Sequence, residues 1–326
     1  MSNILSAVKF EKAKREKCKA SILIEGLSGH GKTTAALLIA GALTDNKYDK
    51  VAVIDTENRS ARLLADFDTS NGRIGQFNVA ELTKDIGFAP SNYLALRDYA
   101  VNELGSDVVI EDSISHAWQY DGGVLDIVSR LKSQVDRYKK DAYAVWGDPE
   151  VVTEKNKLLA LIRDSRCHII STVRVKEKME YTTDANGKNK LESLGEQQIQ
   201  QADLKYEPDL TLHALEPGSI VNGVVKYPKV RVEKSRYAIF SLGQEYELTP
   251  TLLKQLKDYL EEGADPNELK EQQRLEYVGA LKDLLESQPT KKAIATVMKD
   301  DEGFKDKKFS ELPLETIKKI YSSLIS

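Results

Sequence analysis

Cysteine is scarce in this sequence, and long hydrophobic runs are missing. Only Cys18 and Cys167 occur among 326 residues, which argues against a disulfide scaffold and favours a reducing compartment such as the cytoplasm. The longest apolar stretch, around Ala35 to Leu43, is far too short to span a membrane. The first residues do not have the pattern of a secretory signal peptide. We therefore expect a cytoplasmic protein with no membrane partner.

An excess of charge of one sign is also lacking. The chain has 47 Lys and Arg residues against 51 Asp and Glu residues, which gives a formal net charge of −4. A uniformly basic surface for nucleic acid or membrane is therefore excluded, although a local basic patch is not. The four histidines show no metal-ligand spacing with each other or with cysteine, which argues against a zinc site. They are His30, His116, His168 and His213.

The apolar residues that are present form a pattern of alternating strands and helices. A length of 326 residues fits about two domains, or one α/β core with a tail. Short β-branched runs, apolar at consecutive positions, predict a mostly parallel sheet buried on both faces. These runs are residues 21–25, 51–55, 108–112 and 168–173. Three later segments predict antiparallel strands joined by short turns. They are residues 204–215, 221–233 and 237–242.

The C-terminal part has a helical pattern. Thr249 followed by Pro250 predicts a helix N-cap with proline at the first helical position. Breaks at residues 263–266 and 288–290 predict further helices, the last of them over 314–325. We accordingly predict three parts. They are a basic N-terminal arm (residues 1–19), an α/β core (residues 20–247) and a small C-terminal helical region (residues 248–326).

The strongest motif is a glycine-rich loop between a predicted strand and a predicted helix. Residues 26–33, with the sequence GLSGHGKT, match the pattern G-x-x-x-x-G-K-[ST]. Glycines let the backbone N–H groups wrap a phosphate, while the helix N-terminus and a lysine add positive charge. The motif predicts ATP binding with Mg²⁺ on the threonine hydroxyl. The candidate contacts are Gly26, Ser28, Gly29, His30, Gly31, Lys32, Thr33 and Thr34.

Two strand ends supply carboxylates for the same site. The run 108–112 ends in Glu111 and Asp112, and either acid can hold Mg²⁺ in a site of this kind. We favour Asp112, because successive side chains of a strand point to opposite faces. The run 51–55 leads into Glu57, which we predict to activate the attacking water. Asp55 is expected to support the turn instead.

The order of these motifs resembles the RecA-type ATPase core. The matching residues are Gly26 to Thr33, Ile54 to Glu57, Val109 to Ser113 and Ser171 to Arg174. More narrowly, the segments 144–148, 168–181, 194–207 and 232–236 resemble phage-encoded RecA-like ATPases of the single-strand annealing and recombination group. The resemblance covers roughly residues 20 to 245 and implies a RecA-like P-loop NTPase core.

This resemblance also implies roles for individual residues. Lys32 and Thr33 are expected at the phosphates and Mg²⁺, with Glu57 as the water-activating carboxylate and Asp112 as the Mg²⁺ carboxylate. Thr172 falls at the γ-phosphate-sensing position, where the family usually has an amide. Lys234 and Arg236 fall where the family presents two cations to the ATP of a neighbouring subunit. A homo-oligomer with ATP at its subunit interfaces is therefore expected.

We therefore expect an ATP-dependent protein that acts in phage DNA recombination or strand annealing. It would assemble on single-stranded DNA in the host cytoplasm. A single-strand binding protein or another replication or recombination protein is a further possible partner. Two segments are candidates for DNA contact: the polar stretch 182–190 and the basic stretch 9–19, which is equally compatible with a solvated helix. The alternatives are a hexameric replication motor or helicase loader, a small-molecule kinase using Arg59 and Arg62, and a nucleotide-gated scaffold with little turnover.

Overall fold

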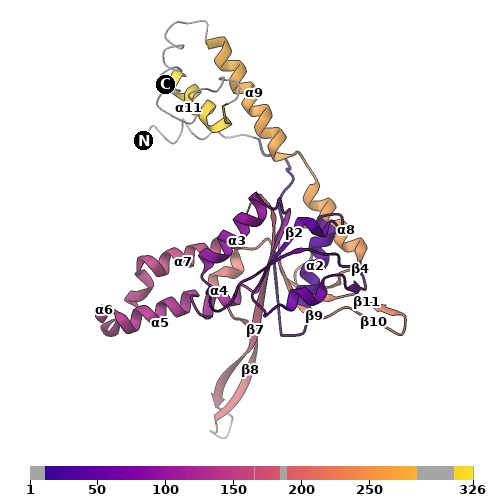
Figure 1. The fold of residues 1–326 in the computed structure, drawn as a ribbon, viewed down its shortest axis with the longest axis vertical. Coiled ribbons are helices and arrows are strands. Elements are labelled where there is room, and N and C mark those ends of the chain that lie inside the picture. The colour runs from indigo at the N-terminus through magenta and orange to yellow at the C-terminus, as the bar shows by residue number, and fades with distance from the viewer. Residues whose placement is uncertain (1–11, 165, 184–188, 285–311, 326) are drawn as a thin grey trace. The chain divides into compact units, whose positions relative to one another are not determined.

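The chain folds into two compact units, which are described separately. The structure, a computed structural model, describes residues 12–164, 166–183, 189–284 and 312–325 (Figure 1). The larger unit is Cys18–Leu260, and the smaller unit combines the N-terminal residues up to Lys17 with the residues from Glu261 onward.

A mostly parallel sheet forms the centre of the larger unit. Its strand order is β13-β12-β9-β1-β7-β6-β2-β5, in which the six strands from β9 to β5 are parallel and β12 and β13 are antiparallel. The mixed α/β fold with a mostly parallel sheet is thus confirmed. The strands are β1 (Ser21–Gly26), β2 (Val51–Asp55), β5 (Asn78–Glu81), β6 (Val108–Asp112), β7 (His168–Thr183), β9 (Leu210–Glu216), β12 (Lys229–Ser235) and β13 (Glu245–Glu247).

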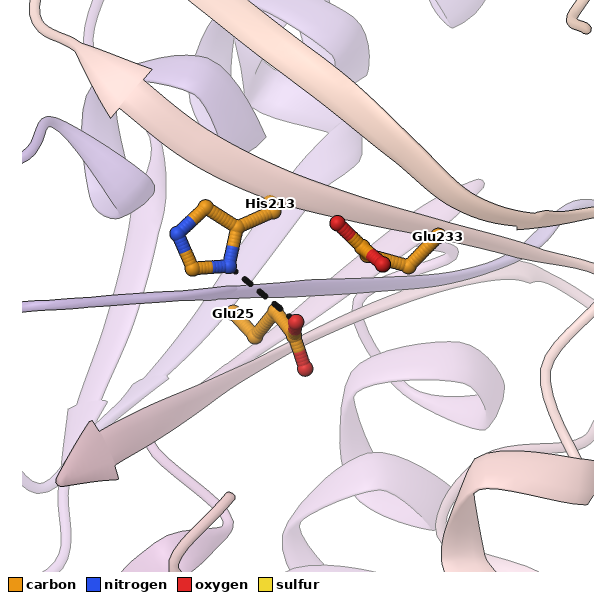
Figure 2. Close-up of side chains that lie close together, drawn as sticks. All are labelled: Glu25, His213 and Glu233. Atoms are coloured by element: carbon orange, nitrogen blue, oxygen red, sulfur yellow. Dashed lines mark hydrogen bonds and ion pairs between the residues drawn. The ribbon is translucent and has the colours of Figure 1, made fainter. Parts of the chain in front are cut away.

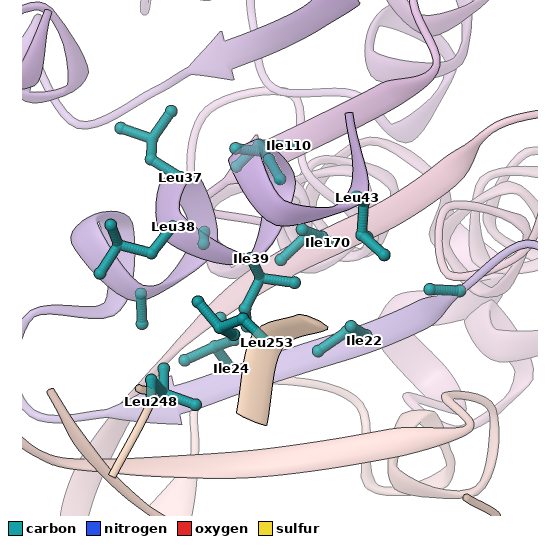
Figure 3. Close-up of a cluster of buried hydrophobic side chains, with 14 of the residues drawn as sticks. Ile22, Ile24, Leu37, Leu38, Ile39, Leu43, Ile110, Ile170, Leu248 and Leu253 are labelled. Atoms are coloured by element: carbon teal, nitrogen blue, oxygen red, sulfur yellow. The ribbon is translucent and has the colours of Figure 1, made fainter. Parts of the chain in front are cut away.

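Helices bury both faces of this sheet. Alternation along β1 sends Ile22 and Ile24 to one face, where they pack with α2 (Lys32–Leu43) and with Leu253 of α8 (Pro250–Glu261) (Figure 3). Leu23 points to the opposite face, which is covered by α3, α5 and α7. These helices span Pro90–Asn102, Val124–Gln134 and Pro149–Ala160. The double coverage explains why the central strands are apolar at consecutive positions.

Short elements complete the larger unit. The short helices are α4 (Ser115–Gln119) and α6 (Asp136–Lys140), and 3₁₀ segments span Tyr48–Lys50, Ser60–Leu64, Ala144–Gly147 and Ala202–Tyr206. Two small hairpins are formed by β3 (Asp68–Thr69) with β4 (Gly72–Arg73) and by β10 (Ser219–Val221) with β11 (Val224–Lys226).

The four predicted parallel strands are confirmed, but the fourth is longer than predicted. After leaving the parallel sheet, β7 continues to Thr183 and pairs antiparallel with β8 (Asn189–Gln198). The polar stretch 182–190, a candidate for DNA contact, therefore begins in β7 and ends in β8, and residues 184–188 lie outside the described part. Cross-strand backbone pairing compensates for the missing apolar pattern.

The antiparallel segments were predicted only in part. The range 204–215 begins in a 3₁₀ segment before β9, and 221–233 divides into β10, β11 and β12. The prediction of a strand over residues 237–242 is wrong. These residues form a turn, and the side chains of Tyr237 and Phe240 are buried although they do not belong to a strand. The short strand β5 was not predicted, since its four residues are half-buried and lack a clear alternation.

The predicted N-cap at Thr249 is confirmed, because its hydroxyl accepts the N–H of Leu252 at 3.2 Å. Helix α8 packs into the core of the larger unit through Leu253, Leu256 and Leu260. The smaller unit contains α9 (Pro266–Leu284) and α11 (Leu314–Ile325), with an apolar cluster of its own. The helix predicted from 288–290 lies outside the described residues. Among the described helices, none combines the length and apolar character needed to cross a membrane.

Candidate functional site

The glycine-rich loop lies where β1 ends and α2 begins. Gly29 and Gly31 have φ values of 83° and 80°, a left-handed conformation that suits glycine. Gly31 is the N-cap of α2, and a Cβ there would lie 3.0 Å from Pro217. Because the first N–H groups of a helix have no intrahelical partner, they are available to an anion in this loop. Ser28 lies in the loop and Thr34 in the first turn of α2.

Lys32 folds back over the loop. Its Nζ donates to the carbonyl oxygens of Gly26 and Leu27, at 3.0 and 2.9 Å. Burial lowers the pKa of the ammonium, and the negative charges of Asp112 and Glu57 oppose this shift. The loop is also attached to the sheet, since Nδ1 of His30 lies 3.2 Å from the carbonyl oxygen of Ala214. A phosphate could take over the contacts that the two carbonyls now make with Lys32.

Asp112 accepts two hydroxyl groups at the end of β6. Thr33 Oγ1 donates to Oδ2 at 2.6 Å, and Thr172 Oγ1 donates to Oδ1 at 2.5 Å. Thr172 reaches this carboxylate because β7 lies between β1 and β6 in the sheet. Burial raises the pKa of Asp112, and the two hydroxyl donors oppose that shift. The hydroxyl and carboxylate oxygens form a donor set that suits Mg²⁺, so the residues fit the ion that the motif predicts.

Glu111 points to the other face of β6, as alternation predicts. It is fully buried and accepts the hydroxyl of Ser171 at 2.8 Å, with Nη1 of Arg97 at 3.7 Å. Burial raises the pKa of Glu111 to about 7. Of the two acids at the end of β6, Asp112 is therefore the one that faces the glycine-rich loop.

Glu57 follows the end of β2, and Asp55 supports the turn between them. Asp55 accepts the N–H groups of Glu57 at 2.7 Å and of Ala61 at 3.0 Å. The side chain of Glu57 pairs with Arg174 of β7, whose Nε donates to Oε1 at 2.7 Å while Nη2 contacts Oε2. No role was predicted for Arg174 from the sequence. Arg174 lies two residues after Thr172 in β7, so its side chain points to the same face of the strand. This spacing could have identified Arg174 as a residue of the site.

Thr56 connects the ends of β2 and β6. Its N–H donates to the carbonyl oxygen of Asp112 at 2.7 Å, and its Oγ1 accepts the N–H of Ser113 at 2.8 Å. Nδ1 of His116 lies 2.6 Å from the same hydroxyl oxygen. These buried contacts hold Glu57 and Asp112 in a defined relative position. Thr56 and His116 were not predicted from the sequence as part of the site.

Lys234 and Arg236 lie at the opposite edge of the sheet. Ser235 pairs with Leu210, which is beside Ile22 in β1, whereas the loop begins at Gly26. At about 3.3 Å per residue, these positions are separated by about 13 Å along the strand. In this chain Lys234 Nζ donates to the carbonyl oxygen of Tyr206 at 2.6 Å, and Arg236 pairs with Asp209 at 2.8 Å. The structure does not bring them to the glycine-rich loop of the same chain.

Glu25, His213 and Glu233 meet on the polar side of β1, β9 and β12 (Figure 2). Nδ1 of His213 lies 3.1 Å from Glu25, and Nε2 lies 3.2 Å from Glu196 of β8. The hydrogen bond with Glu25 raises the pKa of His213. Glu233 in turn accepts Nε of Arg231 at 2.7 Å. These contacts form an ion-pair network that connects β9 with β1 and β8.

The remaining candidate residues have other surroundings. Arg59 and Arg62 both pair with Glu81, at 2.8 and 2.7 Å, so each of these possible kinase residues has a carboxylate partner. Of the basic stretch 9–19, residues 9–11 lie outside the described part. Lys17, in the described remainder of this stretch, lies 3.9 Å from Asp265.

The solved structures that are similar to this chain include two from archaea. One is a KaiC-like protein from the archaeon Pyrococcus horikoshii OT3, with 17% identity and a TM-score of 0.38, covering 70% of this chain and 84% of that chain. The other is the flagellar accessory protein FlaH from Methanocaldococcus jannaschii, with 16% identity and a TM-score of 0.37, covering 71% of this chain and 84% of that chain. No curated protein matches the sequence.

A family model described as an AAA domain matches residues 18–228. This range includes the glycine-rich loop, Glu57, Asp112 and Thr172, and it ends before Lys234 and Arg236. The match covers more than half of the chain and agrees with the strand–loop–helix geometry of the loop. The chain therefore belongs to the AAA domain family and carries the P-loop of a nucleotide-binding protein.

Proposed function

We propose that this protein is a Mg²⁺-dependent ATPase that assembles as a homo-oligomer on single-stranded DNA and acts in phage DNA recombination or strand annealing. The observation that carries the ATPase proposal is the convergence of three elements at one edge of the sheet. The P-loop follows β1, Asp112 ends β6 next to Thr33, and Glu57 follows β2. Groups that bind phosphate and metal and a group that can activate water are thus adjacent.

In this proposal the chain's own groups divide the work of hydrolysis. The N–H groups of the P-loop and Lys32 bind the phosphates, while Thr33 and Asp112 offer oxygen ligands to Mg²⁺. Bound Mg²⁺ neutralises charge on the phosphate oxygens. Glu57 orients the attacking water and accepts its proton. Thr172, hydrogen-bonded to Asp112, senses whether the γ-phosphate is present.

Phosphate release tests the ATPase proposal directly. We expect Lys32→Ala and Glu57→Gln each to lower turnover by at least about 100-fold, because each removes a group that acts on the reacting phosphate or water. Lys47→Ala and Glu103→Gln are matched controls, since both native side chains are exposed. Full turnover in Glu57→Gln would leave a different residue as the base.

Two surface features support assembly of several copies. Lys234 and Arg236 are too far from their own P-loop to act there, so a head-to-tail neighbour is the arrangement that would use them. In addition, the β10–β11 hairpin exposes four large aliphatic side chains beyond Pro217, which lies beside the P-loop. Their exposed fractions are 52% for Ile220, 60% for Val221, 60% for Val224 and 45% for Val225. Such a patch is typical of a surface that a partner covers.

A mixing experiment tests whether the ATP site is shared between subunits. Lys32→Ala inactivates the P-loop of its own chain, whereas Arg236→Ala removes the cation given to the neighbour. If the site is shared, each variant alone is inactive and a mixture recovers part of the turnover, because some interfaces combine an intact P-loop with an intact Arg236. Arg231→Ala, in β12, the strand that ends just before Arg236, is the matched control. An Arg236→Ala variant with normal turnover would refute the shared site.

The DNA part of the proposal depends on the resemblance of the motif set and on the position of the β7–β8 hairpin. This hairpin extends from the same strand that carries Thr172. Fluorescence anisotropy with a labelled thymidine oligonucleotide tests it. We expect a non-hydrolysable ATP analogue to raise the affinity, because an oligomer adds the small patches of many subunits. Equal affinity with and without the analogue would refute ATP-dependent assembly on DNA.

A replication motor or helicase loader is the second candidate. The smaller unit favours it, since α9 and α11 form a helical module with its own apolar cluster, separate from the ATPase core. Strand separation in a fork assay, or co-purification with a helicase, would support this function over annealing. Co-purification with a single-strand binding protein would instead support the recombination role.

A further inference from the structure

Three strands bring Glu25, His213 and Glu233 together at one end of the central sheet. Glu25 of β1 pairs with His213 of β9, and β12, the next strand in the sheet, places Glu233 beside both. One ligand atom of each residue lies within 4.8 Å of those of the other two. Glu25 and His213 are 188 residues apart in the sequence. The lack of metal-ligand spacing among the histidines therefore does not exclude a metal site at this point of the fold.

The ring of His213 has the arrangement of a metal ligand. Figure 2 shows that Nδ1 faces the carboxylates of Glu25 and Glu233, whereas Nε2 points away from them. Nδ1 lies 3.1 Å from Oε1 of Glu25, and Nε2 lies 3.2 Å from Oε2 of Glu196 in β8. A histidine that binds a metal through one nitrogen almost always donates its other N–H to a carboxylate, a carbonyl or water, which fixes the tautomer. Glu196 is such an acceptor for Nε2, and Nδ1 is then left as the ligand atom.

The distances suit a small ion. Zn²⁺ binds nitrogen and oxygen ligands at about 2.0–2.2 Å, so two ligands of a tetrahedral site lie about 3.3 Å apart. The 3.1 Å between Nδ1 of His213 and Oε1 of Glu25 is close to this value, and both side chains are almost buried. The side chain of Glu233 is 37% exposed, so it has room to adjust and an ion can enter from solvent. Two of the three ligands are therefore preformed.

The charge of the cluster favours a divalent cation. Glu25, Glu196 and Glu233 place three negative charges around one imidazole. Arg231 supplies one positive charge, because its Nε donates to Oε1 of Glu233 at 2.7 Å. When His213 is neutral, two negative charges are left, and a divalent cation would cancel both of them. Such a cation would also offset the cost of holding carboxylates in a partly buried position.

We propose that Nδ1 of His213 and the carboxylates of Glu25 and Glu233 form a second metal site, for a divalent first-row metal of which Zn²⁺ fits best. Imidazole suits Zn²⁺, whereas Mg²⁺ and Ca²⁺ prefer oxygen ligands alone. Three protein ligands leave the fourth tetrahedral position open to water or another oxygen ligand. None of the three residues belongs to the proposed Mg²⁺ set of Thr33 and Asp112, so the inference goes beyond the proposed function and does not depend on it.

The second metal site lies next to the P-loop along the chain. Glu25 is followed directly by Gly26 of the loop. His213 is followed by Ala214, whose carbonyl oxygen lies 3.2 Å from Nδ1 of His30 in the loop. An ion that joins β1 to β9 at this point would therefore stabilise the strand ends to which the P-loop is attached.

Binding of Zn²⁺ to the full chain tests the site. The protein is first stripped of metal with a chelator and is then kept in excess Mg²⁺ without nucleotide. Competition with a chromophoric zinc chelator should show one high-affinity Zn²⁺ per chain. We expect His213→Ala to weaken this binding at least about 100-fold, because loss of an outer-shell partner alone costs about 10–100-fold. His168→Asn, which changes another buried histidine, is the matched control and should bind Zn²⁺ as the native protein does.

Two further variants keep the test decisive if His213→Ala does not fold. Glu233→Gln changes an exposed ligand and should weaken Zn²⁺ binding at least about tenfold, whereas Glu196→Gln removes only the acceptor of Nε2 and should weaken it about 10–100-fold. Glu216→Gln, at an exposed acid at the end of β9, is their control. Zn²⁺ at about 100 times its Kd should also raise the Tm of the native chain by about 5–10 °C, and this rise should be lost in Glu233→Gln.

Three results would overturn the second metal site. The first is native Zn²⁺ affinity in His213→Ala or in Glu233→Gln. The second is loss of Zn²⁺ binding in excess Mg²⁺, because a site with an imidazole ligand should prefer Zn²⁺. The third is loss of binding in Cys18→Ser, which would assign the ion to this exposed thiol. All three are measured without ATP, so they are independent of the outcome for Lys32→Ala in the test of hydrolysis.

Discussion

Thr33 in the first turn of α2 and Asp112 at the end of β6 are 79 residues apart in the sequence, yet the hydroxyl of Thr33 donates to Oδ2 of Asp112 at 2.6 Å. This contact joins the P-loop to the strand that ends in Asp112, the proposed Mg²⁺ ligand. A Mg²⁺ ion that takes oxygen ligands from both motifs would require the two motifs to lie at fixed positions relative to each other in the sheet.

Asp112→Asn tests this pair. We expect hydrolysis to fall by at least about 100-fold, because an amide is a much weaker ligand for Mg²⁺ than a carboxylate. Binding of a fluorescent ATP analogue in the presence of a chelator should change little, since the P-loop itself is intact. Asp85→Asn, at an exposed position, is the control. Equal loss of binding with and without Mg²⁺ would mean that Asp112 supports the P-loop rather than the ion.

Thr172→Val removes the second hydroxyl donor to Asp112. The carboxylate is buried, so one oxygen that loses its donor should lower the free energy of unfolding by about 1–3 kcal/mol. Thr172→Ser keeps the hydroxyl and should cost less than Thr172→Val. Urea unfolding of the nucleotide-free protein measures both. Destabilisation by Thr172→Ser but not by Thr172→Val would indicate that the methyl group, not the hydroxyl, matters at this position.

Glu111→Gln tests the buried acid on the other face of β6. The pKa of Glu111 is raised to about 7 from an ordinary value of 4.5, so its contribution to stability is present at low pH and is lost as the pH rises through 7. Glu111→Gln does not titrate. The native protein should therefore lose up to about 3 kcal/mol relative to this variant between pH 5 and 8, from about 1.4 kcal/mol per pKa unit.

The measurement for Glu111 is urea unfolding at several pH values. Glu216→Gln, which changes an exposed acid at the end of β9, is the control. A stability difference between the native protein and Glu111→Gln that does not change with pH would show that Arg97 keeps Glu111 ionised when folded.

His168→Asn should show the opposite pH dependence. His168 is buried at the start of β7, its Nδ1 accepts the N–H of Ala20 at 2.9 Å, and burial lowers its pKa to about 3. The unfolded chain takes up a proton near pH 6.5 and the folded chain does not, so stability is lost as the pH falls below that value. The native protein should lose about 1.4 kcal/mol per pH unit relative to His168→Asn, which keeps an acceptor and does not titrate.

Unfolding between pH 7 and 4 checks the prediction for His168. The comparison of the two proteins removes the acid effects that they share. A constant difference over this range would show that His168 becomes protonated in the folded protein without cost.

The exposed β10–β11 hairpin gives a prediction on assembly. Ile220→Ser together with Val224→Ser should shift the full chain toward monomers in sedimentation velocity with Mg²⁺ and an ATP analogue, because it removes apolar area from a surface that a neighbour would cover. ATP binding by the monomer should persist. Leu63→Ser, at an exposed leucine 78% accessible to solvent, is the control. Unchanged assembly would assign the hairpin to another partner.

The sequence alone was informative where a local pattern has a local cause. The four parallel strands, the P-loop before α2 and the N-cap at Thr249 were all predicted, because glycine, proline and β-branched residues act on their own backbone. Alternation along one strand was also sufficient to predict that Asp112 and Glu111 point to opposite faces of the strand, with Asp112 next to Thr33 of the P-loop. These features need no knowledge of distant residues.

The hairpin of β7 and β8, the turn that buries Tyr237 and the short strand β5 could not be predicted in the same way. Each is stabilised by a neighbouring segment rather than by its own pattern. Cross-strand hydrogen bonds order the polar residues of the hairpin. Tyr237 lies in a turn and is buried by packing against α8 and β1. An alternating sequence pattern cannot predict burial of this kind.

The sequence by itself determined the fold class, the position of the P-loop and the acids that end β2 and β6, because these depend on residue type and short-range spacing. Tertiary structure decided which groups meet. Only the order of strands in the sheet places Thr172 beside Asp112 and Arg174 on Glu57, and only the register of β12 places Lys234 and Arg236 at the edge far from the P-loop. Strand order and register arise from packing between segments distant in the chain, which is why motif spacing could not reveal the contact between Glu57 and Arg174.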